Sequence, residues 1–448
     1  MTKLFSQNPF FCGVLLFLFY SLSAYAATPD PAQLTEADEA AVKASINEYL
    51  DRLDHLESQY GAYETELQQE LGSLGILYQS VGMHDEAVDA FKRQYQIERT
   101  NVGLYSAEQI NILRNMIVSL VATREWEEVE DRHFFIQQLM AYNYPANDPR
   151  KVALLTERAD WHMYAGANNI DDKSPLHHFL TARNSLSEAT RLTYIPGSPM
   201  TDEIEDMYQQ LLYLDYQVAI AERAAASQGQ SSPRLSSRTR TDAYFYSRSR
   251  SRSNDAFGPT NRTQVSSAPT LGLNSFRNGF SRLERLRDSY AADPSGKTSD
   301  VGRIEAQMAD WCSIWLKQSS AQSYYQRAWQ TLSQPGVSPE ARAEVFDQPV
   351  RLTHFLDEHD AKPATSKSVK QGYVIYDLYI DATGRVRSLE VVEALPNTLT
   401  KHISRTNRSV SKTRYRPRYV DGAPVATEKY RTKALFTYTT SDEANQGG

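Results

Sequence analysis

Apolar residues recur every three or four positions through most of the chain, over residues 38–225 and again over 275–356. This spacing places them on one face of a helix, so the pattern predicts a long series of amphipathic helices. Over residues 372–440 the pattern changes to an alternation of apolar and polar residues, which predicts strands. We therefore expect a mostly α chain, stacked as an α-solenoid, followed by a small α+β domain with an antiparallel sheet.

The alternating stretch predicts the order strand, strand, helix, strand, strand (ββαββ). The first strand has apolar residues at every second position, which are Val374, Tyr376, Leu378 and Ile380. Asp381 and Gly384 frame a tight turn into the second strand, and Pro396 opens a short helical pattern. Pro417 interrupts the third strand and favours an edge or a bulge there. A second Asp-Gly turn precedes a last, aromatic strand.

These residues, in this order, resemble the C-terminal domain of the TonB energy transducers. The matching positions are Asp381, Gly384, Arg385, Val386, Tyr415, Pro417, Asp421, Gly422, Pro424 and Val425. The resemblance covers residues 372–440. It implies a domain that binds protein partners in the cell envelope and takes part in transport across it.

The helical part contains a repeat. The spacing of one tetratricopeptide (TPR) repeat is matched by Leu74, Gly75, Tyr78, Gly82, Ala87 and Phe91. Gly75 and Ala87 are small enough for two paired helices to approach closely, and the larger residues would fill the space between them. Gly82 suits the turn between the two helices, and Asp85 is a candidate N-cap of the second helix.

Weaker copies of this unit follow at a longer step of 42 residues. A third unit is expected with Gly166 at its turn, and a fourth near Ala309-Asp310-Trp311. The residues assigned to these copies are Met116, Leu120, Val129, Ala159, Asp160, Trp161, Phe179, Ala182, Leu186, Ala189, Ala321, Tyr325 and Ala328. Because one helix pair cannot cover its own apolar face, the pairs must stack into a curved arm. In families with such repeats, the groove of the arm binds peptide segments of partner proteins.

Residues 1–26 have the pattern of a signal peptide. An apolar run from 10 to 22 is followed by Ala24-Tyr25-Ala26, a small-x-small cleavage site. Together with the TonB resemblance, this predicts export to the periplasm of a Gram-negative bacterium. The alternative is an uncleaved inner-membrane anchor, since the apolar run approaches the length that spans a bilayer.

Residues 227–274 are rich in Ser and Arg and poor in aliphatic residues, so they are predicted to form a disordered insert. Its arginines would suit anionic lipid or a cell-wall polymer, and the alternative is a solvated linker. A short polar linker is expected at 357–371. The formal net charge of −7 argues against general binding of nucleic acid.

Candidate chemistry is sparse. The sequence contains no hydrolase, metalloprotease or nucleotide-binding motif, so it predicts neither an enzyme nor a cofactor. The histidines of the helical region are His84, His133, His162, His177 and His178. Since no Asp or Glu accompanies them at ligand spacing, they are interpreted as solvated or capping residues and not as metal ligands. Cys312 lies among large apolar residues and is interpreted as a buried residue on a helix, not a reactive thiol.

Basic residues are dense between 401 and 433. The basic patch expected on the β domain consists of Arg414, Arg416, Arg418, Arg431 and Lys433. Such a patch could bind an acidic partner. The alternative is that it forms the water-facing side of the sheet, where basic side chains discourage pairing with other strands.

Three functions remain open from the sequence. The leading hypothesis is a non-enzymatic periplasmic adaptor that binds envelope proteins or peptides through its repeat groove and its sheet edge, assisting transport. The alternative is a membrane-anchored TonB-type energy transducer for outer-membrane transport. An enzyme is the third and least favoured hypothesis.

Overall fold

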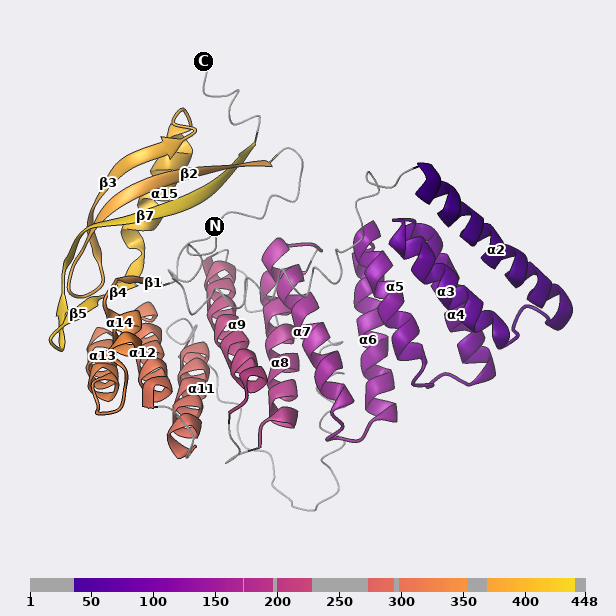
Figure 1. Ribbon diagram of the computed structural model, residues 1–448, viewed down its shortest axis with the longest axis horizontal. Helices are drawn as coiled ribbons and strands as arrows, with labels where there is room; N and C mark the ends of the chain where they lie inside the picture. The colour runs from indigo at the N-terminus through magenta and orange to yellow at the C-terminus, as the bar shows by residue number, and fades with distance from the viewer. Residues whose placement is uncertain are drawn as a thin grey trace.

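The computed structural model describes residues 36–171, 173–195, 200–227, 273–293, 298–352 and 369–439. A row of helices leads into a C-terminal region with antiparallel sheets (Figure 1). The predicted fold class, mostly α and then α+β, is confirmed. The predicted signal peptide at 1–26 lies outside the described residues, as do all but the ends of the insert at 227–274 and of the linker at 357–371.

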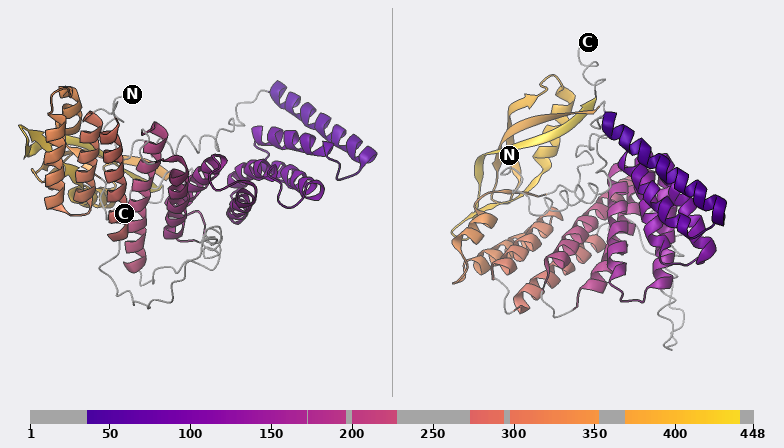
Figure 2. Two further views of the ribbon diagram at one scale, coloured as in Figure 1. Left: turned by 90° about the horizontal axis from the view of Figure 1, so that it is seen from below. Right: turned by 45° about the vertical axis from the view of Figure 1, so that its right-hand side comes forward.

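The helices of the row pack in consecutive order. They are α2 (Glu36–Tyr60), α3 (Glu66–Ser80), α4 (His84–Asn101), α5 (Gln109–Thr123), α6 (Trp126–Asn143), α7 (Arg150–Asn168), α8 (Pro175–Thr193), α9 (Asp202–Ser227), α11 (Leu273–Ala292), α12 (Thr298–Ile314), α13 (Gln318–Leu332) and α14 (Pro339–Phe346). Their buried side chains form several clusters along the row instead of one central core. This is the arrangement expected of stacked helix pairs. Two further views place α2 and the β domain at opposite ends of the row (Figure 2).

The pair α3–α4 shows how small residues set the packing. A Cβ atom at Gly75 would stand 2.5 Å from Cε1 of Phe91, so the helices can approach this closely only with glycine there. Gly82, with φ +78, turns the chain between them. The expected N-cap at Asp85 is wrong, because α4 begins at His84 and Asp85 lies in its first turn. The other residues of the repeat spacing are buried, namely Leu74, Tyr78 and Ala87.

The next pair, α5–α6, repeats this geometry. α6 begins and ends 42 residues after α4. Asn101 Nδ2 donates to the carbonyl oxygen of Tyr63 at 2.8 Å, and Asn143 Nδ2 donates to that of Tyr105 at 2.9 Å. Arg124, with φ 65, occupies the place of the turn glycine. The step of 42 residues therefore describes a structural repeat.

Gly166 does not form a turn, and that expectation is wrong. It lies inside α7, where a Cβ atom would stand 3.0 Å from Cε1 of Phe179 on α8. The left-handed residue that ends α7 is Asn169, with φ 48. Glycine serves both close helix contacts and turns. Its presence in the sequence could not distinguish the two roles.

The helices α9 and α11 pack together, although residues 228–272 separate them in the sequence. Asp215 of α9 is fully buried and accepts hydrogen bonds from Arg282 of α11 at 3.0 Å and from Arg183 of α8 at 3.3 Å. Two arginines thus compensate one buried carboxylate. The chain enters and leaves the segment 228–272 from one packed pair of helices.

The C-terminal domain contains a three-stranded antiparallel sheet in the order β3-β2-β7. Its elements are β2 (Val369–Ile380), β3 (Val386–Leu395), α15 (Thr400–Lys412), β4 (Arg414–Arg416), β5 (Arg418–Val420), β6 (Ala423–Val425) and β7 (Thr427–Thr439). The alternating apolar residues of β2 are buried in a core that includes Leu399 and Val410. The helix α15 therefore covers one face of the sheet.

Two details differ from the predicted order of elements. α15 begins at Thr400 and not at Pro396. The predicted third strand is broken at Pro417, which has no N–H to contribute to a ladder. On one side of this proline, β4 pairs with β1 (Val350–Leu352), and on the other side β5 pairs with β6. Neither of the two halves joins the main sheet.

Candidate functional site

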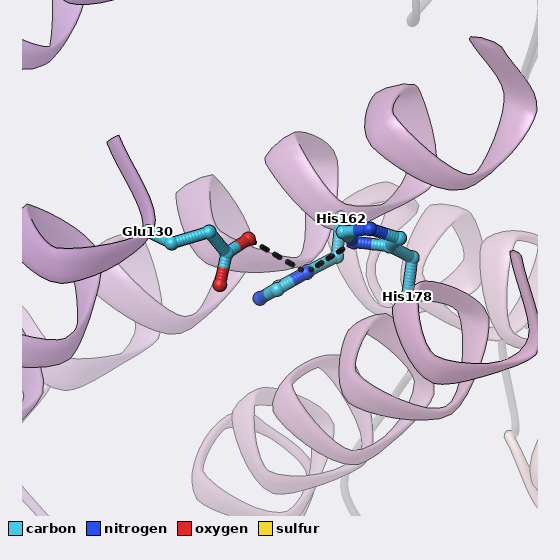
Figure 3. A group of neighbouring side chains, drawn as sticks. All are labelled: Glu130, His162 and His178. Atoms are coloured by element: carbon cyan, nitrogen blue, oxygen red, sulfur yellow. Dashed lines mark hydrogen bonds and ion pairs between the residues drawn. The ribbon is translucent and has the colours of Figure 1, made fainter. Parts of the chain in front are cut away.

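Three consecutive helices bring together two histidines and a glutamate. Glu130 lies on α6, His162 on α7 and His178 on α8, and their side chains converge (Figure 3). Nδ1 of His162 lies 3.0 Å from Nδ1 of His178 and 3.6 Å from Oε1 of Glu130. Both histidines are 1% exposed. Two imidazole nitrogens and one carboxylate oxygen thus lie within 4.8 Å of one another inside the protein.

Neighbouring side chains orient this cluster. Nε2 of His178 lies 2.9 Å from Oδ1 of Asp171. Since a carboxylate only accepts hydrogen bonds, Nε2 of neutral His178 carries the proton and its Nδ1 presents a lone pair. Nε1 of Trp161 donates to Oε1 of Glu130 at 2.9 Å, and Nζ of Lys173 lies 3.0 Å from Oε2 of the same carboxylate.

Burial decides the charge of the cluster. It disfavours the imidazolium form and lowers the pKa of His162 well below its usual value. Burial alone would raise the pKa of Glu130, but attraction to His162 when that imidazole is protonated, attraction to Lys173 and the hydrogen bond from Trp161 outweigh it and lower that pKa. At neutral pH the cluster therefore contains an ionised carboxylate and a neutral imidazole at position 162.

Two more histidines lie beside the cluster. The ring of His133 stacks on Trp161 with 6.0 Å between centroids, and burial lowers the pKa of His133 to about 4. The ring of His177 lies 5.5 Å from that of His178, in an edge-to-face arrangement. Neither belongs to the group whose ligand atoms lie within 4.8 Å of one another.

The interpretation of the helical-region histidines as solvated or capping residues is wrong for His133, His162 and His178, which are buried. The sequence gave no reason to connect Glu130 with them, because the three members of the cluster come from three helices and form no short spacing. Such a cluster could have been suspected only from polar residues on the buried faces of otherwise apolar helices.

The predicted basic patch is not continuous. Arg416 is 3% exposed, and its Nε donates to Oδ1 of Asp310 on α12 at 3.0 Å. Its Nη1 donates to the carbonyl oxygen of Val345 at 3.1 Å. The expectation that Arg416 is exposed on the sheet is wrong. Pro417 breaks the alternation of the strand, and Arg416 points into the helices instead.

The other members of the patch differ in exposure and in the residues that they contact. Arg418 is exposed and Arg414 is half-buried, where burial lowers the pKa of its guanidinium. Arg431 pairs with Asp377 of β2 through two contacts of 2.8 Å. The ammonium group of Lys433 lies 4.0 Å from the ring centre of Tyr373.

The residues of the TonB-like motif lie in two turns and in the strand residues next to these turns. Oδ1 of Asp381 accepts hydrogen bonds from the N–H groups of Thr383 at 2.8 Å and Arg385 at 3.0 Å. A Cβ atom at Gly384 would stand 1.8 Å from the carbonyl oxygen of Tyr415, so the turn is locked against β4. The remaining motif residues are Val386 at the start of β3, Pro417 between β4 and β5, Asp421 and Gly422 between β5 and β6, and Pro424 and Val425 in β6.

β3 is an edge strand that, within the described part of the chain, pairs only with β2. Its residues Val391, Val392 and Leu395 are 39%, 46% and 57% exposed. The outer edge of such a strand presents N–H and C=O groups to which an extended peptide can add. The exposed apolar side chains would contact the added strand.

No family model matches the chain, and the curated proteins contain no match to it. Among the helices of the described ranges, none combines the length and the hydropathy that crossing a bilayer requires.

Proposed function

We propose that this chain is a non-enzymatic interaction protein of the cell envelope, whose β domain binds an extended segment of a partner protein along β3. The observation that carries the proposal is the exposed edge of β3 with its three large apolar side chains, Val391, Val392 and Leu395. Glu390 and Glu393 flank the two valines and are also exposed, so charges accompany the apolar side chains on this strand. An exposed strand edge is the surface to which an extended peptide adds.

The helical arm supplies a second contact. Tyr105 and Tyr142 stack with 4.6 Å between their ring centroids, and they are 52% and 69% exposed. Leu104, next to Tyr105 in the sequence, is 57% exposed. Exposed clusters of large apolar residues are characteristic of protein interaction sites. A TPR-like arm would present them to a second partner.

The resemblance to TPR repeats and to the TonB C-terminal domain agrees with this role. An adaptor released into the periplasm requires cleavage of residues 1–26, whereas the alternative, an energy transducer, requires that they remain as an anchor. The mass and the N-terminal residue of the protein from its native cells distinguish the two. A processed chain in the soluble fraction supports the adaptor, and an intact chain in the membrane fraction supports the transducer.

Site-specific cross-linking tests the edge itself. A photo-reactive amino acid at position 392 should capture a protein partner in native cells. The substitution Leu395→Lys on β3 should abolish the cross-link, because the charge opposes an added apolar strand. Leu435→Lys on β7 is the matched control, since Leu435 is also a half-exposed leucine, at 50%. An equal loss with both variants, or no captured protein, would contradict binding at the β3 edge.

A further inference from the structure

We propose that Glu130, His162 and His178 bind one divalent transition-metal cation, for which Zn²⁺ is the best match, and that this cation ties α6 to the α7–α8 pair. The proposal is independent of the partner-binding role of β3. It concerns a site on α6–α8 of the helical arm. In the sequence, the helices α9–α14 separate this site from the β domain.

The spacing of the ligand atoms fits one small cation. Zn²⁺ forms bonds of about 2.0–2.1 Å to imidazole nitrogen and carboxylate oxygen, so the ligand atoms of a tetrahedral site lie about 3.3–3.5 Å apart. The two separations from Nδ1 of His162 are 3.0 Å to Nδ1 of His178 and 3.6 Å to Oε1 of Glu130. Both lie close to this range. All three ligand atoms lie within 4.8 Å of one another.

The types of ligand indicate the class of cation. Two imidazoles and one carboxylate form the protein ligands of open zinc sites, in which the fourth position is occupied by water. Mg²⁺ and Ca²⁺ prefer sites made of oxygen ligands and would bind here weakly. The cluster should therefore distinguish Zn²⁺ and Co²⁺ from the alkaline-earth cations.

The surrounding contacts prepare these atoms for a cation. Asp171 holds the proton of His178 on Nε2, so that Nδ1 can act as a ligand, and such carboxylate–histidine pairs commonly orient metal ligands. Lys173 contacts Oε2 of Glu130 and Trp161 donates to Oε1, which leaves the second lone pair of Oε1 for the cation. Without a cation, the short distance between the histidines is bridged by a proton on Nδ1 of His162, donated to Nδ1 of His178.

The cation replaces that bridging proton, and His162 then carries its proton on Nε2. This nitrogen is buried and has no hydrogen-bond partner. A buried N–H without a partner weakens binding. We therefore expect an affinity below that of closed zinc sites with four protein ligands.

The position of the cluster gives the cation a structural consequence. α6 and α7 touch over only a short stretch, whereas α7 and α8 pack closely along their length. Glu130 is on the α6 side of this weak junction, and the two histidines are on the other. A cation bound by all three would add a further link between α6 and the α7–α8 pair, beside the contacts of Glu130 with Trp161 and Lys173.

Titration of the chelator-treated, full-length protein tests the site. Calorimetry with Zn²⁺ should give one cation per chain, and Co²⁺ should give the visible absorption of a tetrahedral complex. His162→Gln and His178→Gln should each abolish both signals, and Glu130→Gln should weaken binding by more than about tenfold. His133→Gln is the matched control, because His133 is also buried between the helices but does not belong to the group of candidate ligands.

Thermal unfolding provides an independent readout. Zn²⁺ should raise the midpoint temperature of the native protein and of His133→Gln, while Mg²⁺ should not. If the histidine variants do not fold, Glu130→Gln decides the outcome, because it keeps the shape of the side chain. Two results would overturn the proposal and leave a purely hydrogen-bonded cluster. One is that the unsubstituted protein does not bind Zn²⁺. The other is that Glu130→Gln and the folded histidine variants bind Zn²⁺ as tightly as the unsubstituted protein does.

Discussion

Asp310 of α12 and Arg416 of β4 lie 106 residues apart in the sequence and form a buried ion pair between the helical row and the β domain. The hydroxyl of Tyr325 donates to the same carboxylate at 2.7 Å. Nearby, Tyr419 of β5 packs on Phe346 of α14, with 4.8 Å between ring centroids. The β domain is therefore docked on α12–α14 by a charged contact surrounded by aromatic side chains.

Arg416→Met should destabilise the protein by about 3–5 kcal/mol, because it leaves the carboxylate of Asp310 buried without its counter-charge. Urea unfolding measures the loss, and limited proteolysis between the helical row and the β domain should become faster. Arg418→Met is the control, since Arg418 is exposed, and it should change stability by less than about 0.5 kcal/mol. Equal effects of the two substitutions would mean that the ion pair does not hold the junction.

Gly75→Ala should destabilise the arm by about 1–3 kcal/mol through overpacking, since the added methyl group would meet the ring of Phe91. Gly72→Ala is a matched control on the same helix. There the Cβ atom would stand 2.8 Å from Nε2 of Gln94, the movable end of a flexible side chain. We expect this control to be neutral or to gain up to about 1 kcal/mol from helix propensity.

Thermal unfolding of the two alanine variants, followed by circular dichroism, separates these outcomes. The double variant Gly75→Ala, Phe91→Leu should recover part of the loss, because the smaller side chain makes room for the methyl group. If both single variants had the same midpoint temperature, the close contact between α3 and α4 would not limit stability.

Local patterns were enough to predict the helices and their pairing. The step of 42 residues was visible because each unit repeats the same short-range packing, and Gly75 with Phe91 belongs to such a unit. The burial of Cys312 could be predicted for the same reason, since its apolar neighbours lie on the same helix. These features depend on residues that are close in the sequence.

Long-range contacts decided two of the features that were predicted wrongly, the burial of Arg416 and that of the histidines beside Glu130. Arg416 has the spacing of a solvent-facing strand residue, and only the position of Asp310, in a different domain, explains its burial. The convergence of Glu130 and the two histidines depends on how α6 stacks against α7 and α8. The sequence of each single helix does not show how the helices stack, so the cluster could not be predicted from the spacing of residues along the chain.

Cys312 should be unreactive in the native protein. The side chain is 1% exposed, and burial raises the pKa of its thiol to about 12, so the reactive thiolate is scarce at neutral pH. A thiol reagent such as DTNB should therefore react with it only after addition of denaturant. Ser58→Cys, at an exposed position of α2, should react at once and serves as the control. Fast labelling of Cys312 under native conditions would indicate that α12 and α13 open readily.

Asp381 should make the stability of the β domain depend on pH in the acidic range. Burial alone would raise the pKa of this carboxyl, but the hydrogen bonds from Thr383 and Arg385 and the contact with Arg387 outweigh it and lower the pKa from 3.8 to about 2. A carboxyl with a lowered pKa in the folded state stabilises the fold above the pKa of the unfolded chain, and this stabilisation is lost as the pH falls through the folded value.

Asp381→Asn should therefore destabilise the protein by about 1–2 kcal/mol at neutral pH, after allowance for screening by solvent. The difference in the free energy of unfolding between the unsubstituted protein and this variant should shrink below about pH 4 and largely vanish near pH 2. Urea unfolding at a series of pH values measures it, with the exposed Asp347→Asn as a control that should stay within about 0.5 kcal/mol throughout. A difference that is constant with pH would assign the effect of Asp381 to the shape of the turn and not to its charge.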